Sequence, residues 1–85
     1  MRLDKYLKVT RLIKRRTVAN EACDEGRVTV NGKVARASYD VKVGDIIGIT
    51  MGQRTMSVKV LNVTEYVKKE NAADNYVVID DGNNG

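Results

Sequence analysis

The spacing of apolar residues divides the chain into a helical front and a stranded back. Near the N-terminus Leu3 and Leu7 belong to an apolar set that recurs every three to four residues, which predicts a helix over residues 3–10. A second set with the same period predicts a helix over residues 17–25. Gly26 follows it, as expected of the left-handed residue that ends many helices.

After Gly26 the period changes from helical to two. Val28 and Val30 flank Thr29, and Asn31-Gly32 is a strong signal for a tight hairpin. Alternating segments predict further strands at residues 46–49, 56–60 and 76–79. The polar residues 66–75 remain open between a helical turn and a loop. The pattern therefore predicts an α+β fold, with two N-terminal helices packed on a small, mostly antiparallel sheet.

With 85 residues the chain has room for one core, so we expect one domain over residues 1–80 and a disordered tail at 81–85. The expected core consists of Leu3, Leu7, Leu12, Ile13, Val18, Ala22, Val28, Val30, Val34, Ile46, Ile47 and Ile49.

Charge is distributed unevenly along the chain. Residues 1–36 hold ten Lys and Arg against four Asp and Glu, a net charge of +6, whereas the remainder has five against seven, a net charge of −2. This asymmetry favours a surface that binds a polyanion. The candidate residues are Arg2, Lys5, Lys8, Arg11, Lys14, Arg15 and Arg16, with Lys33 and Arg36 as peripheral contacts.

The first five of these cations recur at every third position. On one straight helix each step of three rotates by about 300°, so the charges would drift around the axis instead of sharing a face. A break near residues 10–13 would turn the chain into a two-helix corner. We expect this corner to gather the cations into one positive surface.

Arg15 and Arg16 occupy the start of the second helix, where a capping side chain is preferred and arginine opposes the dipole. In one interpretation they and the free backbone N–H groups receive a phosphate. In the other, Thr17 caps the helix and both arginines extend into water. We favour the first, and expect Arg16→Ala to weaken binding without lowering stability.

The partner is expected to be folded RNA, recognised by its shape and its phosphates. Aromatic residues make up only 5% of the chain, so the stacking platforms of single-strand binders are missing. Asn31-Gly32 sits at the hairpin tip, where contact with a ribose or phosphate competes with a purely conformational role. We favour the conformational role, because such turns need positive φ at both positions.

Other chemistry finds little support. The chain has no histidine, and its single cysteine, Cys23, lies among small apolar residues, which favours a buried packing role over a reactive thiol. Carboxylate pairs such as Asp80-Asp81 have no activating partner, so we expect no enzyme, no metal and no cofactor. No apolar run approaches the length of a membrane span, and we expect a soluble cytoplasmic protein.

Four segments together resemble the S4-type RNA-binding domain: residues 2–7, 15–19, 26–33 and 41–47. The resemblance implies an αL motif over residues 1–50, in which the two helices and the hairpin bind RNA, with residues 51–80 as a strand extension. S4 sequences usually have Ser where this chain has Arg15, a departure that weakens the expected helix cap and adds charge.

Over nearly its whole length the chain also resembles the free-standing bacterial RqcP proteins, relatives of the fifteen-kilodalton heat-shock protein. That resemblance implies binding to large ribosomal subunits obstructed by peptidyl-tRNA, and we expect a monomer without a membrane partner. It implies contacts with ribosomal RNA and tRNA, and assistance to an RqcH-type factor in alanine tailing of stalled chains. A ribosome-assembly or RNA-chaperone factor of the same fold, and a DNA-binding module, remain as alternatives.

Overall fold

The computed structural model describes residues 1–64 and 75–80. Their elements are α1 (Leu3–Val9), α2 (Arg16–Asp24), β1 (Val28–Val30), β2 (Lys33–Val34), β3 (Ile46–Met51), β4 (Arg54–Val60) and β5 (Tyr76–Asp80). The bounds of the predicted elements differ from those in the structure by at most two residues at either end. The predicted tail and most of the polar segment 66–75 lie outside the described residues. Neither described helix has the length and apolar character needed to cross a membrane.

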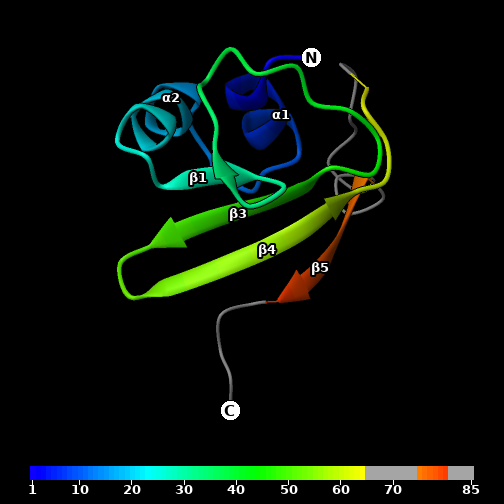
Figure 1. The fold of residues 1–85 in the computed structure, drawn as a ribbon. Coiled ribbons are helices and arrows are strands. Elements are labelled where there is room, and N and C mark those ends of the chain that lie inside the picture. The colour runs from blue at the N-terminus through cyan, green and yellow to red at the C-terminus, as the bar shows by residue number, and fades with distance from the viewer. Residues whose placement is uncertain (65–74, 81–85) are drawn as a thin grey trace.

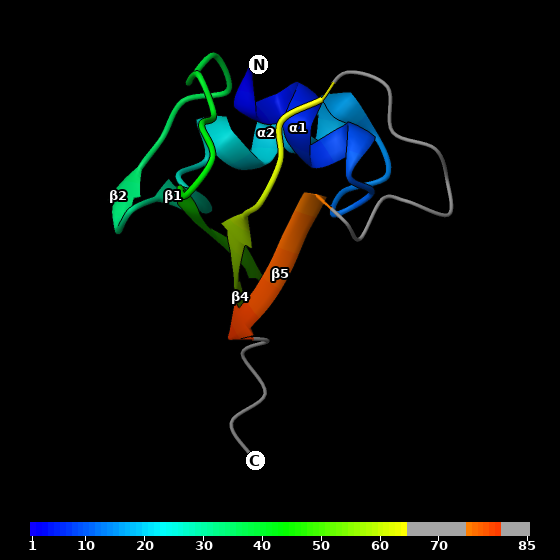
Figure 2. The same ribbon diagram turned by 90° about the vertical axis from the view of Figure 1, so that its right-hand side faces the viewer.

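The strands form one antiparallel sheet in the order β2-β1-β3-β4-β5. Figure 1 shows α1 and α2 side by side over one face of this sheet, and the turned view in Figure 2 keeps both helices on that side. The predicted α+β architecture, two helices on an antiparallel sheet, is therefore confirmed.

Strand register explains how the core forms. Val30 lies opposite Ile47, which lies opposite Val58, and all three side chains are buried. From α1, Leu3 and Leu7 are fully buried as predicted. The core also includes residues outside the expected core set, although a buried role was expected for Cys23: Tyr6, Ala19, Cys23, Ala35, Ala37, Val41, Val58 and Val60.

Helix α2 contributes only small side chains to the core: Ala19, Ala22 and Cys23. Small residues let two backbones approach closely, and α2 packs directly on α1. Burial, and then the nearby Asp4 and Asp24, raises the pKa of the Cys23 thiol to about 11. The predicted packing role of Cys23 agrees with this burial.

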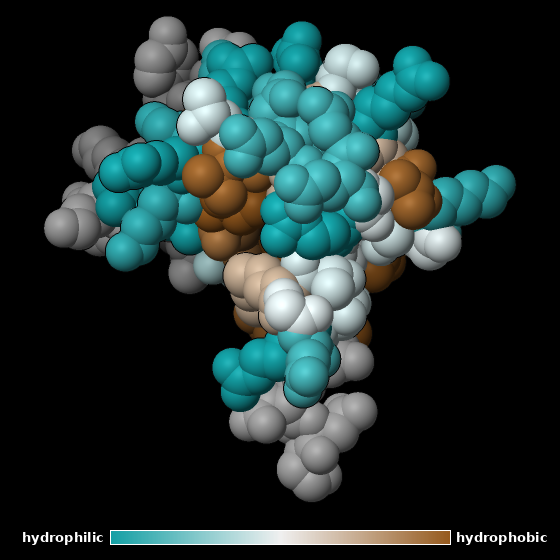
Figure 3. Space-filling view, turned by 90° about the vertical axis from the view of Figure 1, so that its left-hand side faces the viewer, coloured by the Kyte–Doolittle hydropathy of each residue, from teal (hydrophilic) through white to brown (hydrophobic). Residues whose placement is uncertain are grey.

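The core prediction is wrong for Val18 and Val34. Val18 is 43% exposed, because α2 turns Ala19, Ala22 and Cys23 inward and leaves Val18 on its flank. Hydrophobic side chains do reach the surface on the α2 side of the molecule (Figure 3). Val34 is 66% exposed because it pairs with Thr29, on the sheet face opposite that of Val28 and Val30. Among the rest, Leu12, Ile13 and Ile46 are only partly buried.

The predicted turns agree with the structure. Gly26 adopts a φ of 76°, and its N–H donates to the Cys23 carbonyl at 3.0 Å, which closes α2. Asn31 and Gly32 have φ values of 54° and 85°, as their hairpin turn requires. The Asn31 carboxamide also donates to Asp45 at 3.2 Å and accepts the Ile46 N–H at 3.0 Å. Asn31 therefore joins the hairpin to the start of β3.

Candidate nucleic-acid interface

The helical segment is interrupted between α1 and α2, at the position that the cation spacing required. Thr10 caps α1, and its hydroxyl donates to the Tyr6 carbonyl at 2.6 Å. Arg11 follows with a φ of 63°, a left-handed conformation that is uncommon outside glycine and stops the helix. The Ile13 N–H then donates to the Leu7 carbonyl at 3.0 Å, folding the corner back onto α1. The predicted corner near residues 10–13 is confirmed.

Helix α2 begins without a side-chain cap. Arg15 is its N-cap residue with extended backbone, and Arg16 is its first helical residue. The alternative in which Thr17 caps the helix is wrong, because Thr17 lies inside the first turn and the N-cap residue, Arg15, makes no side-chain capping bond. Among the described residues, none outside α2 accepts a hydrogen bond from the N–H groups of Arg16, Thr17 and Val18, so they could donate to an anion.

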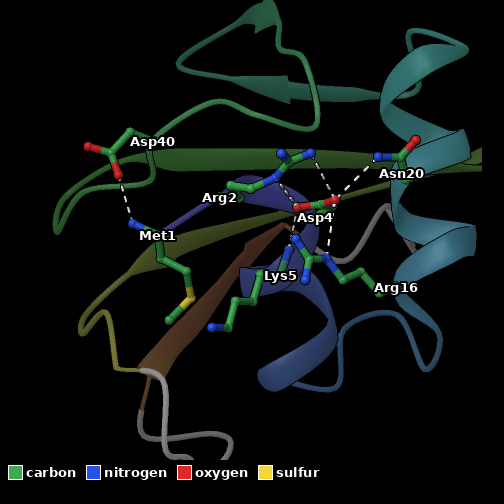
Figure 4. A network of polar contacts seen from close by, with 7 residues as sticks. All are labelled: Met1, Arg2, Asp4, Lys5, Arg16, Asn20 and Asp40. Atoms are coloured by element: carbon green, nitrogen blue, oxygen red, sulfur yellow. Dashed lines mark hydrogen bonds and ion pairs between the residues drawn. The ribbon is translucent and has the colours of Figure 1, made fainter.

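A buried carboxylate joins the start of α1 to the start of α2 (Figure 4). Asp4, only 2% exposed, accepts from Arg2 Nε at 3.2 Å and from the Lys5 N–H at 2.8 Å through Oδ1. Through Oδ2 it accepts from Asn20 Nδ2 at 3.2 Å and pairs with Arg16 Nε at 3.3 Å. Arg2 Nη2 lies 3.4 Å from the same oxygen. One carboxylate thus meets two guanidinium groups.

Asp4 remains charged in this setting. Burial by itself raises the pKa of its carboxyl group, but hydrogen bonds from Arg2, Asn20, Arg16 and the Lys5 backbone outweigh burial and lower the pKa below 3.8. The side chains of Arg2 and Arg16 are 50% and 49% exposed. The cluster therefore presents two half-exposed cations over one buried anion and is net positive.

An open hollow of about 350 Å³ adjoins this cluster. Asp4 and Arg16 line it together with Thr17, Asn20 and Glu21 of α2. The hollow thus borders the uncapped start of α2 and one of the paired guanidinium groups. A phosphate at its mouth would meet both kinds of donor, the side-chain fork and the backbone N–H groups.

The predicted site residues separate into two groups. Direct contacts bring Arg2 and Arg16 together, and Lys5 joins them through its backbone N–H. Among the described residues no ion pair or hydrogen bond with Asp4 involves the other candidates, which are all exposed: Lys8, Arg11, Lys14, Arg15, Lys33 and Arg36.

Arg36 and Lys33 differ in where the fold places them. Arg36 precedes Ala37, whose carbonyl accepts the Asp4 N–H at 3.2 Å, so its segment runs beside the start of α1. Lys33 lies on β2, at the edge of the sheet beyond β1 (Figure 2). The backbone of Arg36 therefore lies near the start of α1, where Arg2 and Asp4 are. Lys33 lies apart from it, at the β2 edge of the sheet.

Asp4 and Asn20 are functional candidates that the sequence reasoning missed. From the sequence alone Asp4 is one of the four acids in residues 1–36, with no functional role assigned to it. The available signal was that Asp4 is the single acid between Arg2 and Arg16, among seven cations. The expectation that Arg16 is dispensable for stability also needs revision, because Arg16 is a partner of a buried carboxylate.

The chain is similar to a known family model, to several relatives and to a solved structure. The S4 domain model matches residues 1–47. The chain is 56% identical over 78 residues to the RQC P-site tRNA stabilizing factor of Halalkalibacterium halodurans, covering 92% of this chain and 89% of the relative. It is 51% identical over 79 residues to the factor of that name from Bacillus subtilis, covering 93% and 92%. A trimeric structure of heat shock protein 15 from Vibrio cholerae superposes with a TM-score of 0.84 at 26% identity, covering 92% and 80%.

Proposed function

The chain belongs to the S4 domain family, and on this basis we propose that it binds RNA in ribosome-associated quality control (RQC), stabilising a P-site tRNA on the large ribosomal subunit. The observation that carries the RNA-binding part is the pair of half-exposed guanidinium groups that meet on Asp4, from Arg2 before α1 and from Arg16 at the uncapped start of α2. Guanidinium forks and helix-start N–H groups both suit phosphate oxygens.

The tRNA and ribosome part is supported by the relatives. Proteins about half identical to this chain over more than nine-tenths of its length carry the name RQC P-site tRNA stabilizing factor. We propose that the basic face, the predicted positive surface made by the cations from Arg2 to Arg16, contacts ribosomal RNA of the large subunit and the tRNA held there. We further propose that the bound state assists an RqcH-type factor in adding alanine tails to stalled nascent chains.

Three further properties belong to the same proposal. The protein acts in the cytoplasm, it binds without catalysing a reaction, and it functions as a monomer. Because the Vibrio cholerae relative was solved as a trimer, the oligomeric state is to be measured by sedimentation at the concentration used for binding.

Cosedimentation separates this function from its rivals. The purified chain is mixed with large subunits that carry peptidyl-tRNA, with vacant large subunits, with immature large-subunit particles, and with duplex DNA. The proposal expects the strongest retention on subunits that carry peptidyl-tRNA. Preferential retention on immature particles would support an assembly factor instead, and preference for duplex DNA would overturn the RNA assignment.

A further inference from the structure

We propose that Asp4 is a positioning residue that holds Arg2 and Arg16 as a single clamp for one phosphate group. This inference rests on the proposed RNA-binding function and adds to it a residue that does not itself touch RNA. Through Asp4, the cations Arg2 and Arg16 act together in recognising one phosphate.

The geometry ties both arginines to one rigid anchor. Arg2 precedes α1 and Arg16 opens α2, so the two side chains start from different helices. Their Nε atoms meet opposite oxygens of the Asp4 carboxylate at 3.2 and 3.3 Å. Figure 4 shows the two guanidinium groups reaching the carboxylate from either side. Asp4 therefore determines their spacing.

The Asp4 carboxylate is itself held in place by two uncharged donors. The Lys5 N–H holds Oδ1 at 2.8 Å, and Asn20 Nδ2 holds Oδ2 at 3.2 Å. With the carboxylate side chain 3% exposed, these donors and the surrounding burial leave it little freedom. An arginine that is already held in place has lost its rotamer freedom before RNA binds, so the entropy cost of ordering it on binding is smaller.

In the part of the chain that the structure describes, no partner occupies the outer ends of either arginine. A guanidinium has five N–H donors, and the contacts with Asp4 use Nε of Arg16, and Nε with one Nη2 donor of Arg2. One carboxylate cannot neutralise two guanidinium groups. A second anion with several acceptor oxygens completes the arrangement, and a phosphodiester group of RNA has this chemistry.

Charge and positioning predict opposite signs for Asp4→Asn. Removing an acid beside an RNA site should tighten binding if charge alone matters, because the local potential becomes more positive. If Asp4 positions the arginines, the neutral variant should bind about tenfold more weakly, since both side chains must then be ordered on binding. Glu21→Gln is the matched control, because Glu21 is an exposed acid lining the same hollow.

Binding is measured with two probes, deacylated tRNA and vacant large ribosomal subunits, for the full chain and both variants at one salt concentration. Weaker binding of Asp4→Asn to either probe, with equal or tighter binding of Glu21→Gln, supports the clamp and shows which RNA supplies the phosphate. Equal or tighter binding of Asp4→Asn to the probes that the wild type binds overturns the clamp alone. If the wild type binds neither probe, large subunits that carry peptidyl-tRNA replace them, and a wild type that does not bind these either overturns the proposed function together with the clamp.

A double-mutant cycle keeps the clamp testable even if Asp4→Asn does not fold. Arg2→Ala, Arg16→Ala and the double variant are compared on whichever probe binds. Two arginines that hold one phosphate should act as a unit, so the double variant should lose affinity by little more than either single variant. Losses that multiply as independent factors would overturn the clamp. A merely structural role of Asp4 would not produce this coupling.

Discussion

At the scale of single residues, Arg16 combines two roles that usually belong to different positions. Its backbone opens α2, and its side chain pairs with the buried Asp4 while remaining half exposed. The unfavourable position of an arginine at a helix start is thereby offset by a buried partner within one salt bridge. The sequence could predict the exposed role from the position of Arg16, but not the partner, which depends on how the corner folds.

Arg16→Ala should weaken binding to large subunits by about 1–3 kcal/mol, the range for hydrogen bonds to charged groups. It should also lower the free energy of unfolding by up to about 1 kcal/mol, since the arginine of the lost ion pair is half exposed. Arg16→Lys should recover only part of the binding, because lysine cannot form the two parallel bonds of a guanidinium. Calorimetric titration and thermal melting check both quantities. Full recovery with lysine would contradict a bidentate contact.

At the scale of elements, a polar junction ties the β1–β2 hairpin to the entry of β3. Asp45 accepts from Asn31 Nδ2 at 3.2 Å, from the Tyr39 hydroxyl at 2.9 Å and from the Lys42 N–H at 3.0 Å. The Asn-Gly turn itself follows from local sequence, so it could be predicted. Its bond to Asp45 spans 14 residues and could not.

This junction should make stability depend on acid. Burial raises the pKa of the Asp45 carboxyl, but the bonds from Lys42, Tyr39 and Asn31 outweigh it, so the folded pKa lies below 3.8. Its contribution is therefore complete above pH 3.8 and is lost as pH falls through the lower folded value. Asp45→Asn should lower the melting temperature at neutral pH and flatten its fall in acid. An unchanged acid slope in the variant would contradict this account.

Gly48 tests the register of the central strands. It lies in β3 between Thr29 of β1 and Ser57 of β4, and a Cβ there would stand 2.6 Å from Thr29 Oγ1. Gly48→Ala should lower the free energy of unfolding by about 1–2 kcal/mol through overpacking. In a Thr29→Ala background most of that loss should disappear. Urea unfolding of the four chains measures the coupling, and an equal loss in both backgrounds would argue against this register.

At the scale of the whole molecule, the architecture was predictable because each element has a local signal. Helical and two-residue periods, Gly26 and the Asn31-Gly32 turn specify the elements, and a corner was required by the cation spacing. The convergence of Arg2 and Arg16 on Asp4 was not predictable, since it depends on how two helices pack. Val34 shows the same limit in the core, because only the pairing with Thr29 reveals which face it occupies.

Two cations on β4 provide the matched control for the basic face. Arg54 and Lys59 are exposed cations on β4, which lies in the sheet away from the helix starts (Figure 1). Removing either should change affinity by only a few tenths of a kcal/mol, as for ordinary surface substitutions. A loss from Lys59→Ala equal to that from Arg2→Ala would mean that the RNA surface is misplaced.

The salt dependence of binding to large subunits that carry peptidyl-tRNA tests the central claim most directly. Seven cations lie in the segment from Arg2 to Arg16, both included, and if about five neutralise phosphates, the slope of log K against log salt should be on the order of −3.5 to −4.5. The double variant Arg2→Ala, Arg16→Ala should have a shallower slope, whereas Arg54→Ala should keep the wild-type value. A wild-type slope near zero would contradict recognition of RNA phosphates by this face.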